Sequence, residues 1–279
     1  RVTAPPGCSP GGVIKVQVPR TKESVDECAQ LLQRADERRP AAPSLRGAAL
    51  VRACGDAGRE GCVRALLGVG AAVDHADASG RTPLMNACLQ GDDLSARALI
   101  EAKANLEAAD SEGNTALIAS CQEGHERCVQ ALVEAKANLE ATHSNGATAL
   151  IISCEQGHER CVQALLAAKA NLEAVNNQGG TSLMYACRDG QESCARALIE
   201  AKADTGATLP SGETALMVAL QSGHAAICAL LKEGGADVTA WDDNPEQVEK
   251  AATKGIETAD LREIDWSGIR ASAPEMAGC

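Results

Sequence analysis

The sequence predicts an all-α solenoid of stacked helix–turn–helix units, each of which projects a β-hairpin loop. Residues 110–142 and 143–175 are nearly the same sequence, so the chain repeats every 33 residues. A period of this length is typical of solenoids, in which each unit packs against its neighbours. Aromatic residues make up 1% of the chain and Phe is absent, so the core must consist of aliphatic side chains and cysteine. The 33-residue step recurs at Thr82, Thr115, Thr148, Thr181 and Thr214 and at Gly91, Gly124, Gly157, Gly190 and Gly223.

Each unit is predicted to be a turn followed by two short antiparallel helices. In the most regular unit, Gly113 lies in the turn, where a positive φ costs nothing for glycine. Thr115 follows at the N-cap position of a first apolar helix, 116–122, because a threonine hydroxyl can accept a hydrogen bond from a free backbone N–H of the first turn. Gly124 ends that helix, and a second helix covers 125–134. One unit cannot bury its apolar face alone, so stacking must supply the core.

The two ends of the repeat array depart from the pattern. In the first repeat the helices are one residue further apart, with the extra residue near Gly55 to Gly58. The unit after Trp241 has neither the turn glycine nor the threonine. Such departures are expected of terminal units, which face water on one side. We predict an extended N-terminal arm (1–23), an N-terminal capping helix and loop (24–44), a repeat array (45–241) with a degenerate first repeat (45–76) and five regular repeats (77–241), a degenerate C-terminal capping repeat (242–266) and a flexible tail (267–279). The repeats of the array are numbered 1 to 6.

Three short motifs carry a resemblance to a known family. Gly-x-Thr-Pro-Leu spans 80–84, Gly-His occurs at 124–125, and Gly-Ala-Ala-Val-Asp spans 70–74. In tandem and in phase, these motifs resemble ankyrin repeats, and the resemblance covers about 45–241. It implies a stack of repeats whose concave face holds protein partners.

Two columns of residues depart from the ankyrin pattern. An apolar residue replaces the histidine that usually follows Thr-Pro-Leu, and lysine stands where the second helix usually ends in glycine. Both changes are compatible with the fold, but we expect lysine to weaken the helix ends. The apolar column is Met85, Ile118, Ile151, Met184 and Met217, and the lysine column is Lys103, Lys136, Lys169 and Lys202.

The concave face that the resemblance implies consists of the hairpin tips and the exposed ends of the first helices. Repeats 3 and 4 have nearly identical helices, but their tips differ, with Ser111-Glu112 in one and Ser144-Asn145 in the other. A binding face would show this pattern, and so would drift at exposed positions. The predicted partner-binding residues are Ser79, Arg81, Gln90, Ser111, Glu112, Asn114, Gln122, Glu123, Ser144, Asn145, Glu155, Gln156, Asn177, Gln178, Tyr185, Arg188, Asp189, Ser211, Glu213 and Gln221.

Composition and charge narrow the classes of partner. The net charge of −12 argues against nucleic acid, which is bound through basic contacts to phosphates. No apolar run approaches the ~20 residues of a membrane span, so we expect a soluble protein without direct membrane insertion. Glutamates on the predicted face favour a protein partner with a basic surface, and no small-molecule substrate is expected. We expect an intracellular, cytoplasmic location by default; because residue 1 is Arg, a processed chain in an organelle stays open.

Thirteen cysteines are the other unusual feature of the sequence. Most recur every 33 residues, so we expect small buried hydrophobes and not the disulfide framework of a small secreted domain. Cys121, His125 and Cys128 superficially resemble metal ligands or a nucleophile–base pair, but a helix break separates the two cysteines. The sequence predicts no catalytic residue, metal site or cofactor. The first-helix column is Cys54, Cys88, Cys121, Cys154 and Cys187, and the second-helix column is Cys62, Cys128, Cys161 and Cys194, with Cys228 one place later.

The predicted function is a non-catalytic scaffold or adaptor that binds a partner protein through the concave face. A structural or accessory subunit built permanently into a larger complex would show the same sequence features and is the alternative. A third hypothesis, from another class, is a thiol- or metal-dependent enzyme, against which the arrangement of the cysteines argues. Repeat architecture predicts the mode of binding and leaves the partner open.

Overall fold

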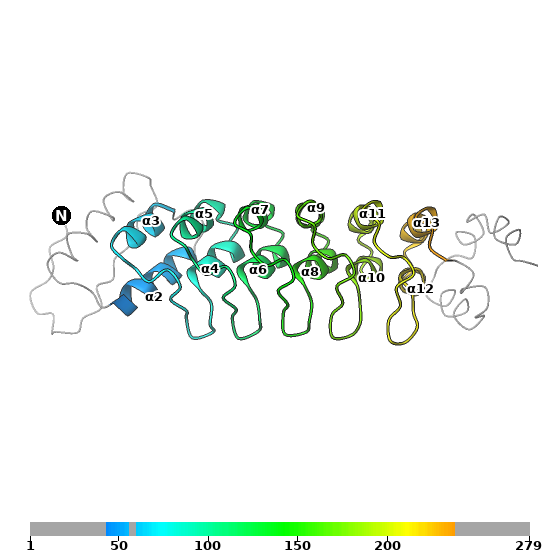
Figure 1. The fold of residues 1–279 in the computed structure, drawn as a ribbon, viewed down its shortest axis with the longest axis horizontal. Helices are drawn as coiled ribbons and strands as arrows, with labels where there is room; N and C mark the ends of the chain where they lie inside the picture. The colour runs from blue at the N-terminus through cyan, green and yellow to red at the C-terminus, as the bar shows by residue number, and fades with distance from the viewer. Residues whose placement is uncertain (1–42, 56–59, 238–279) are drawn as a thin grey trace, which may run out of the picture.

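Figure 1 shows the computed structural model of the chain, which describes residues 43–55 and 60–237. Repeats 1 to 6 fall almost entirely within these ranges. The predicted N-terminal arm, nearly all of the N-terminal cap, the C-terminal capping repeat and the tail lie outside the described residues. Most of the predicted insertion near Gly55 to Gly58 lies outside them as well.

Within the described ranges the chain forms twelve helices, two in each repeat, and isolated β-bridges in place of a sheet. None of these helices is long and apolar enough to cross a membrane. The bridges close the hairpins between Thr142 and Thr148, Val175 and Thr181, and Thr208 and Thr214. The helices are α2 (Pro43–Cys54), α3 (Glu60–Gly68), α4 (Pro83–Leu89), α5 (Asp93–Glu101), α6 (Ala116–Gln122), α7 (Glu126–Glu134), α8 (Ala149–Gln156), α9 (Glu159–Ala167), α10 (Ser182–Arg188), α11 (Glu192–Glu200), α12 (Ala215–Ser222) and α13 (Ala225–Glu233).

The helices form two layers (Figure 1). The even-numbered helices α2 to α12 are the first helices of their repeats and form one layer, and the odd-numbered helices α3 to α13 form the other. Each helix contacts its partner in the same repeat and the equivalent helix in the adjacent repeats. The hairpin loops project from one edge of the stack in a single row. The main contacts therefore run between neighbours, as in a solenoid.

Local sequence explains where each first helix begins. In repeat 3, Thr115 is the N-cap of α6, and its hydroxyl oxygen accepts a hydrogen bond from the Ile118 N–H at 3.3 Å. Gly113 has a φ of 85° in the preceding turn, as predicted. The predicted first helix, 116–122, matches α6, and the second helix begins at Glu126, one residue after its predicted start. Threonine caps the other four regular first helices in the same way.

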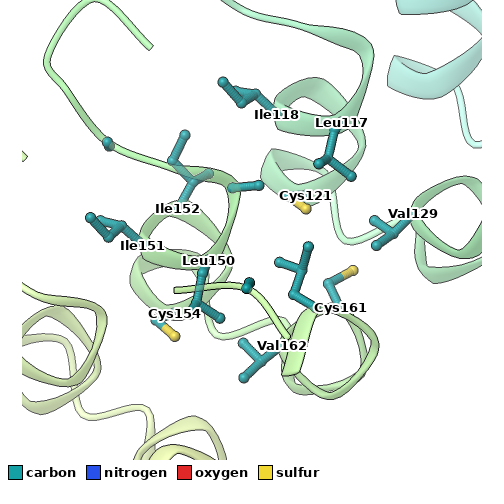
Figure 2. Close-up of a cluster of buried hydrophobic side chains, with 14 of the residues drawn as sticks. Leu117, Ile118, Cys121, Val129, Leu150, Ile151, Ile152, Cys154, Cys161 and Val162 are labelled. Carbon is teal, nitrogen blue, oxygen red and sulfur yellow. The ribbon is translucent and has the colours of Figure 1, made fainter. Parts of the chain in front are cut away.

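Small aliphatic side chains and thiols fill the space between the layers. Leu117 exposes 1% of its surface, and Cys121 exposes none. Figure 2 shows these two side chains of α6 near Leu150 and Cys154 of α8. Because protein interiors are close-packed, side chains of this size let neighbouring repeats approach closely. The apolar column that replaces histidine also lies inward, with Met85, Ile118, Ile151 and Met184 buried and Met217 half-buried.

We expect Leu132→Ala to lower the free energy of unfolding by about 2–5 kcal/mol, because it leaves a cavity in this core. Leu132 on α7 exposes none of its surface. Val175→Ala is the control, since Val175 is 54% exposed and should lose less than about 0.5 kcal/mol. Urea unfolding of both variants measures the difference. Equal losses would contradict the packing described above.

In repeats 3 to 6, one side chain packs against a glycine of the preceding repeat. The imidazole of His125 donates from Nε2 to the carbonyl oxygen of Leu89 at 3.1 Å, at the C-terminal end of α4. Gly91 makes room for the ring, because a Cβ at that position would lie 2.6 Å from Nδ1. The same histidine–carbonyl bond joins repeat 4 to repeat 3 at 3.1 Å and repeat 6 to repeat 5 at 3.2 Å. Glycine is therefore needed here for its φ of 67° and for its missing side chain.

In repeats 1 to 4, a carboxylate also accepts a hydrogen bond from the backbone of the next repeat. In the loop after α5, Glu107 Oε1 accepts from the Asn138 N–H at 2.8 Å. The equivalent bonds join repeats 1 to 5 in succession and form the loop ladder. Its pairs are Asp74 with Asn105, Glu107 with Asn138, Glu140 with Asn171, and Glu173 with Asp204.

The four lysines at the ends of the second helices adopt a left-handed backbone. Lys136 has a φ of 65°, and its N–H donates to the Val133 carbonyl at 3.0 Å. The Ala137 N–H donates to the Leu132 carbonyl, also at 3.0 Å. Together these bonds make a Schellman motif, whose left-handed position is usually glycine. A left-handed backbone costs a residue with a Cβ about 1–2 kcal/mol. We therefore expect the backbone conformation of these lysines to lower the stability of the helix ends.

We expect Lys136→Gly to raise the free energy of unfolding by about 0.5–1 kcal/mol. Glycine relieves the left-handed strain and loses part of that gain to the greater freedom of the unfolded chain. Gln130→Gly, in the right-handed middle of α7, is the matched control and should lower stability by about 0.5–1 kcal/mol. Denaturant unfolding tests the pair. A loss of stability in both variants would mean that the lysine charge outweighs its backbone strain.

Candidate protein-binding surface

The residues predicted to bind a partner belong to one surface, the tip face, which consists of the hairpin tips and the C-terminal ends of the first helices. Hydrogen bonds join the two parts. At the end of α12, Gln221 Nε2 donates to Glu213 Oε1 in the hairpin of the same repeat at 2.7 Å. In repeat 5, the Tyr185 hydroxyl donates to Gln178 Oε1 at 3.1 Å. Tips and helix ends therefore lie close enough to contact a single partner.

Exposure differs among the twenty predicted positions. Two of them, Asn114 and Tyr185, are buried and expose 8% of their surface. Four are half-buried, namely Arg81, Glu155, Glu213 and Gln221. The fourteen exposed positions are Ser79, Gln90, Ser111, Glu112, Gln122, Glu123, Ser144, Asn145, Gln156, Asn177, Gln178, Arg188, Asp189 and Ser211.

In repeats 3 and 5, an acidic or amide side chain at the start of the turn accepts hydrogen bonds from the backbone of the hairpin tip. Asp110 Oδ1 accepts hydrogen bonds from the N–H groups of Glu112 and Asn114, both at 2.9 Å. Burial by itself would raise the pKa of Asp110, but these hydrogen bonds and the Arg81 guanidinium lower it below its usual value. Asn176 holds the same position in repeat 5. The sequence-based prediction missed these braces, although acidic and amide residues at the start of the turn, in step with the repeat, were a visible signal.

Backbone hydrogen bonds join consecutive tips. In three successive pairs, the N–H of one tip donates to a carbonyl oxygen of the preceding tip at 2.9–3.0 Å. Pro210 occupies the next position and has no N–H, so it cannot donate the equivalent bond from repeat 6 to repeat 5. The three pairs are Ser111 with Ser79, Ser144 with Glu112, and Asn177 with Asn145.

Repeat 5 carries a guanidinium–aromatic pair on the tip face. The guanidinium of Arg188 lies 4.3 Å from the centroid of the Tyr185 ring. Arg188 also pairs with Asp189 at 2.8 Å and with Glu155 at 2.9 Å. The hydrogen bond to Asp189, and then that to Glu155, raise the pKa of Arg188. Since the Tyr185 hydroxyl is hydrogen-bonded to Asn176, the ring is held against its own hairpin and is not an exposed anchor.

The tip face is acidic, but few of its carboxylates are unpaired. Its predicted positions carry five carboxylates and two guanidinium groups, a net charge of −3. Glu155 and Asp189 pair with Arg188. Glu213 accepts two hydrogen bonds within repeat 6. Glu123 is exposed and forms no ion pair or side-chain hydrogen bond with any described residue, so it is the most available of the five.

The recurring cysteines lie in the core. All ten cysteines within the described ranges are buried, and Figure 2 shows Cys121 and Cys161 among apolar side chains. Burial raises the pKa of Cys161 to about 11, so little of the nucleophilic thiolate exists at neutral pH. Burial, with a smaller contribution from Asp92, raises the pKa of Cys54 to about 12. Among the described residues, no group of three or more His, Cys, Asp or Glu is arranged to hold a metal ion.

We expect Cys121, Cys154 and Cys187 to react with iodoacetamide only when the protein unfolds, because each thiol is buried and has a raised pKa. Mass spectrometry after labelling with and without denaturant measures each site. Cys8 and Cys279, which we predict to react quickly, lie outside the described residues and serve as the internal comparison. Labelling of the three core thiols at the rate of Cys8 in the native protein would contradict their burial.

Comparison with known protein families decides what the stack is. The family model described as Ankyrin repeats (3 copies) matches residues 50–143, 136–209 and 174–242, which together cover more than half of the chain. The chain belongs to the ankyrin repeat family. Ankyrin repeats are generally protein–protein interaction modules, and their fold is typically non-catalytic.

A solved ankyrin structure confirms the predicted fold. The crystal structure of the human ASB11 ankyrin repeat domain is similar to this chain, with a TM-score of 0.67 and 27% sequence identity. The match covers 76% of this ankyrin repeat chain and 96% of the ASB11 chain. A shared fold indicates how a partner is held, but it does not identify the partner.

Short segments also match bacterial UDP-N-acetylmuramoylalanine–D-glutamate ligases. The match to the ligase of Rhizobium johnstonii is 73% identical over 30 residues, which are 11% of this chain and 6% of the ligase. The match to the ligase of Chelativorans sp. is 62% identical over 32 residues, 12% of this chain and 7% of the ligase. The chain thus spans 6–7% of the length of these enzymes. A match this short does not establish ligase activity.

Proposed function

We propose that this ankyrin repeat chain is a non-catalytic scaffold or adaptor that binds a partner protein through the tip face. The observation that carries the proposal is a row of exposed tip residues that change between repeats above a constant core. Leu117 and Leu150 are equivalent core residues of repeats 3 and 4, whereas Glu112 at one tip corresponds to Asn145 at the other. Varied side chains on a rigid scaffold are typical of recognition surfaces.

The rigidity of the tips supports the proposal. Asp110 braces its hairpin from inside, and backbone hydrogen bonds join the tips of repeats 2 to 5. A surface that is already ordered loses less conformational entropy when a partner binds. The chain therefore offers a pre-organised surface rather than four separate mobile loops.

The charge of the tip face favours a partner with a basic surface. Its net charge of −3 attracts such a partner during encounter, which mainly raises the association rate. Glu123 is the carboxylate best placed for this role, because it is exposed and unpaired within the described residues. Arg188 and Tyr185 form a guanidinium–aromatic pair on this surface. Arg and Tyr are common among the residues that contribute most of the binding energy at protein interfaces.

We expect Glu123→Lys to slow association with the partner several-fold at low salt, with a smaller difference at high salt. The partner is first captured on the immobilised chain and identified, and its association rate constant is then measured with each variant. Glu233→Lys is the matched control, since it makes the same charge change at the end of α13, outside the tip face.

Two results would contradict the proposal. Equal slowing by Glu123→Lys and Glu233→Lys would indicate a general effect of net charge. Unchanged association with Glu123→Lys, in a variant that unfolds at the wild-type temperature, would place the interface on another part of the chain.

A further inference from the structure

A cavity of about 420 Å³ lies between repeats 1 and 2, where α2, the hairpin before α4 and α4 itself come together. The two helices are neighbours at the N-terminal end of the described stack (Figure 1). Ala48, Val51 and Gly55 form an apolar part of the lining, and Val51 exposes only 7% of its surface. A volume of this size is within the range of about 300–1,000 Å³ that is usual for ligand pockets.

Short side chains leave this cavity open. In repeat 5, the longer side chain of Tyr185 reaches its own hairpin and is 8% exposed. Asn86 holds the equivalent position in repeat 2, and its amide donates instead to the Val51 carbonyl oxygen at 3.4 Å. The three short residues of the lining and their larger counterparts in repeats 4 and 5 are Ala48 and Thr148, Gly55 and Glu155, and Asn86 and Tyr185.

Asp77 gives the cavity a hydrogen-bond acceptor and connects it to the tip face. Its Oδ1 accepts hydrogen bonds from the N–H groups of Ser79 and Arg81, two tip-face residues, at 2.9 and 3.0 Å. Its Oδ2 forms no hydrogen bond with another described residue. The hydrogen bond from the Ser79 hydroxyl lowers the pKa of Asp77, so this side chain is ionised at neutral pH and can only accept.

Arg52 gives the cavity a hydrogen-bond donor. It is exposed in the last turn of α2 and forms no ion pair with another described residue. His75 also lines the cavity and holds the hairpin close to α2, because a Cβ on Gly47 would lie 2.5 Å from the His75 Cβ. With one carboxylate and one guanidinium in the lining, an added carboxylate would be repelled by Asp77 and an added cation by Arg52. The lining therefore favours an uncharged group that both donates and accepts, next to an apolar part.

We propose that the cavity binds a tyrosine side chain of the partner protein, whose ring packs against Val51 and whose hydroxyl donates to Asp77 and accepts from Arg52. The inference rests on the proposed function, since it adds an anchor point to the tip face. Repeat 5 contains the same kind of contact within the chain, because the Tyr185 hydroxyl is hydrogen-bonded to Asn176, the counterpart of Asp77. Tyrosine is also one of the residues that most often contribute large binding energies in interface pockets.

The first test titrates N-acetyltyrosinamide into the full chain and follows backbone amide chemical shifts by NMR. We expect shift changes at the residues that line the cavity and a dissociation constant of about 1 mM, as befits one side chain without the rest of a partner. N-acetylphenylalaninamide should bind at least about threefold more weakly, because it has no hydroxyl to pair with the polar groups.

Gly55→Leu should fill the cavity and weaken binding of N-acetyltyrosinamide at least about fivefold. The backbone accepts a side chain there, since a Cβ on Gly55 would lie 3.4 Å from its nearest neighbour, the Arg52 carbonyl oxygen. Gly68→Leu is the matched control and should leave binding within about twofold, because Gly68 lies on α3, away from the cavity, and has open space around it. Thermal unfolding confirms that both variants are folded.

Asp77→Leu is a second variant, which removes the acceptor and should also weaken binding at least about threefold. Leucine is compatible with the hairpin, because Leu209 holds this position in repeat 6 and keeps the backbone hydrogen bonds of the turn at 2.8 and 2.9 Å.

Three results would overturn the proposal. They are no binding of N-acetyltyrosinamide to the wild-type chain, unchanged binding by a folded Gly55→Leu variant, and equal binding of the phenylalanine analogue. The test uses no partner protein, so its failure is distinguishable from failure of the proposed function. Slower partner association with Glu123→Lys but no binding of the tyrosine analogue would contradict only the cavity proposal, and the reverse result would contradict only the tip-face proposal.

Discussion

The stack depends on a recurring contact in which a polar side chain of one repeat packs against a left-handed glycine of the repeat before it. The imidazole of His125 packs against Gly91 and donates a hydrogen bond to the carbonyl oxygen of Leu89 at the C-terminal end of α4. Where histidine is absent, Gln191 occupies the same place over Gly157. Because the contact lies at the ends of the first helices, it sets the relative orientation of the residues that form the tip face. The proposed binding surface and the stacking of the repeats therefore share one structural cause.

Two series of hydrogen bonds, between the tips and within the loop ladder, also join neighbouring repeats outside the core. The net contribution of one hydrogen bond to the free energy of unfolding is only about 0.5–1.5 kcal/mol, but bonds of the same kind recur at successive repeat interfaces. Both sets of bonds end at repeat 5, because Pro210 has no N–H for the next tip bond and Gly206 has no carboxylate for the next bond of the loop ladder. The hairpin of repeat 6 is therefore held to repeat 5 by fewer backbone bonds than the earlier tips are to each other.

The four lysines at the ends of the second helices, Lys103, Lys136, Lys169 and Lys202, are the exception in an otherwise consistent use of glycine. Within the described ranges, twelve glycines have a positive φ, and the four lysines are the non-glycine residues that share this conformation. Each of these lysines therefore keeps a backbone cost that glycine at the same position would avoid.

The sequence by itself determined the repeat period, the buried columns and, in the most regular repeat, the helix boundaries to within one residue. Helix 116–122 was predicted correctly because turn glycines, threonine caps and apolar spacing are local or periodic signals. Only the tertiary structure decided which predicted surface residues are available. It placed Tyr185 beneath Arg188, paired Glu155 with the same guanidinium and left Glu123 unpaired among the described residues. These outcomes depend on side-chain directions and on contacts between residues about 33 positions apart, which a repeat spacing does not specify.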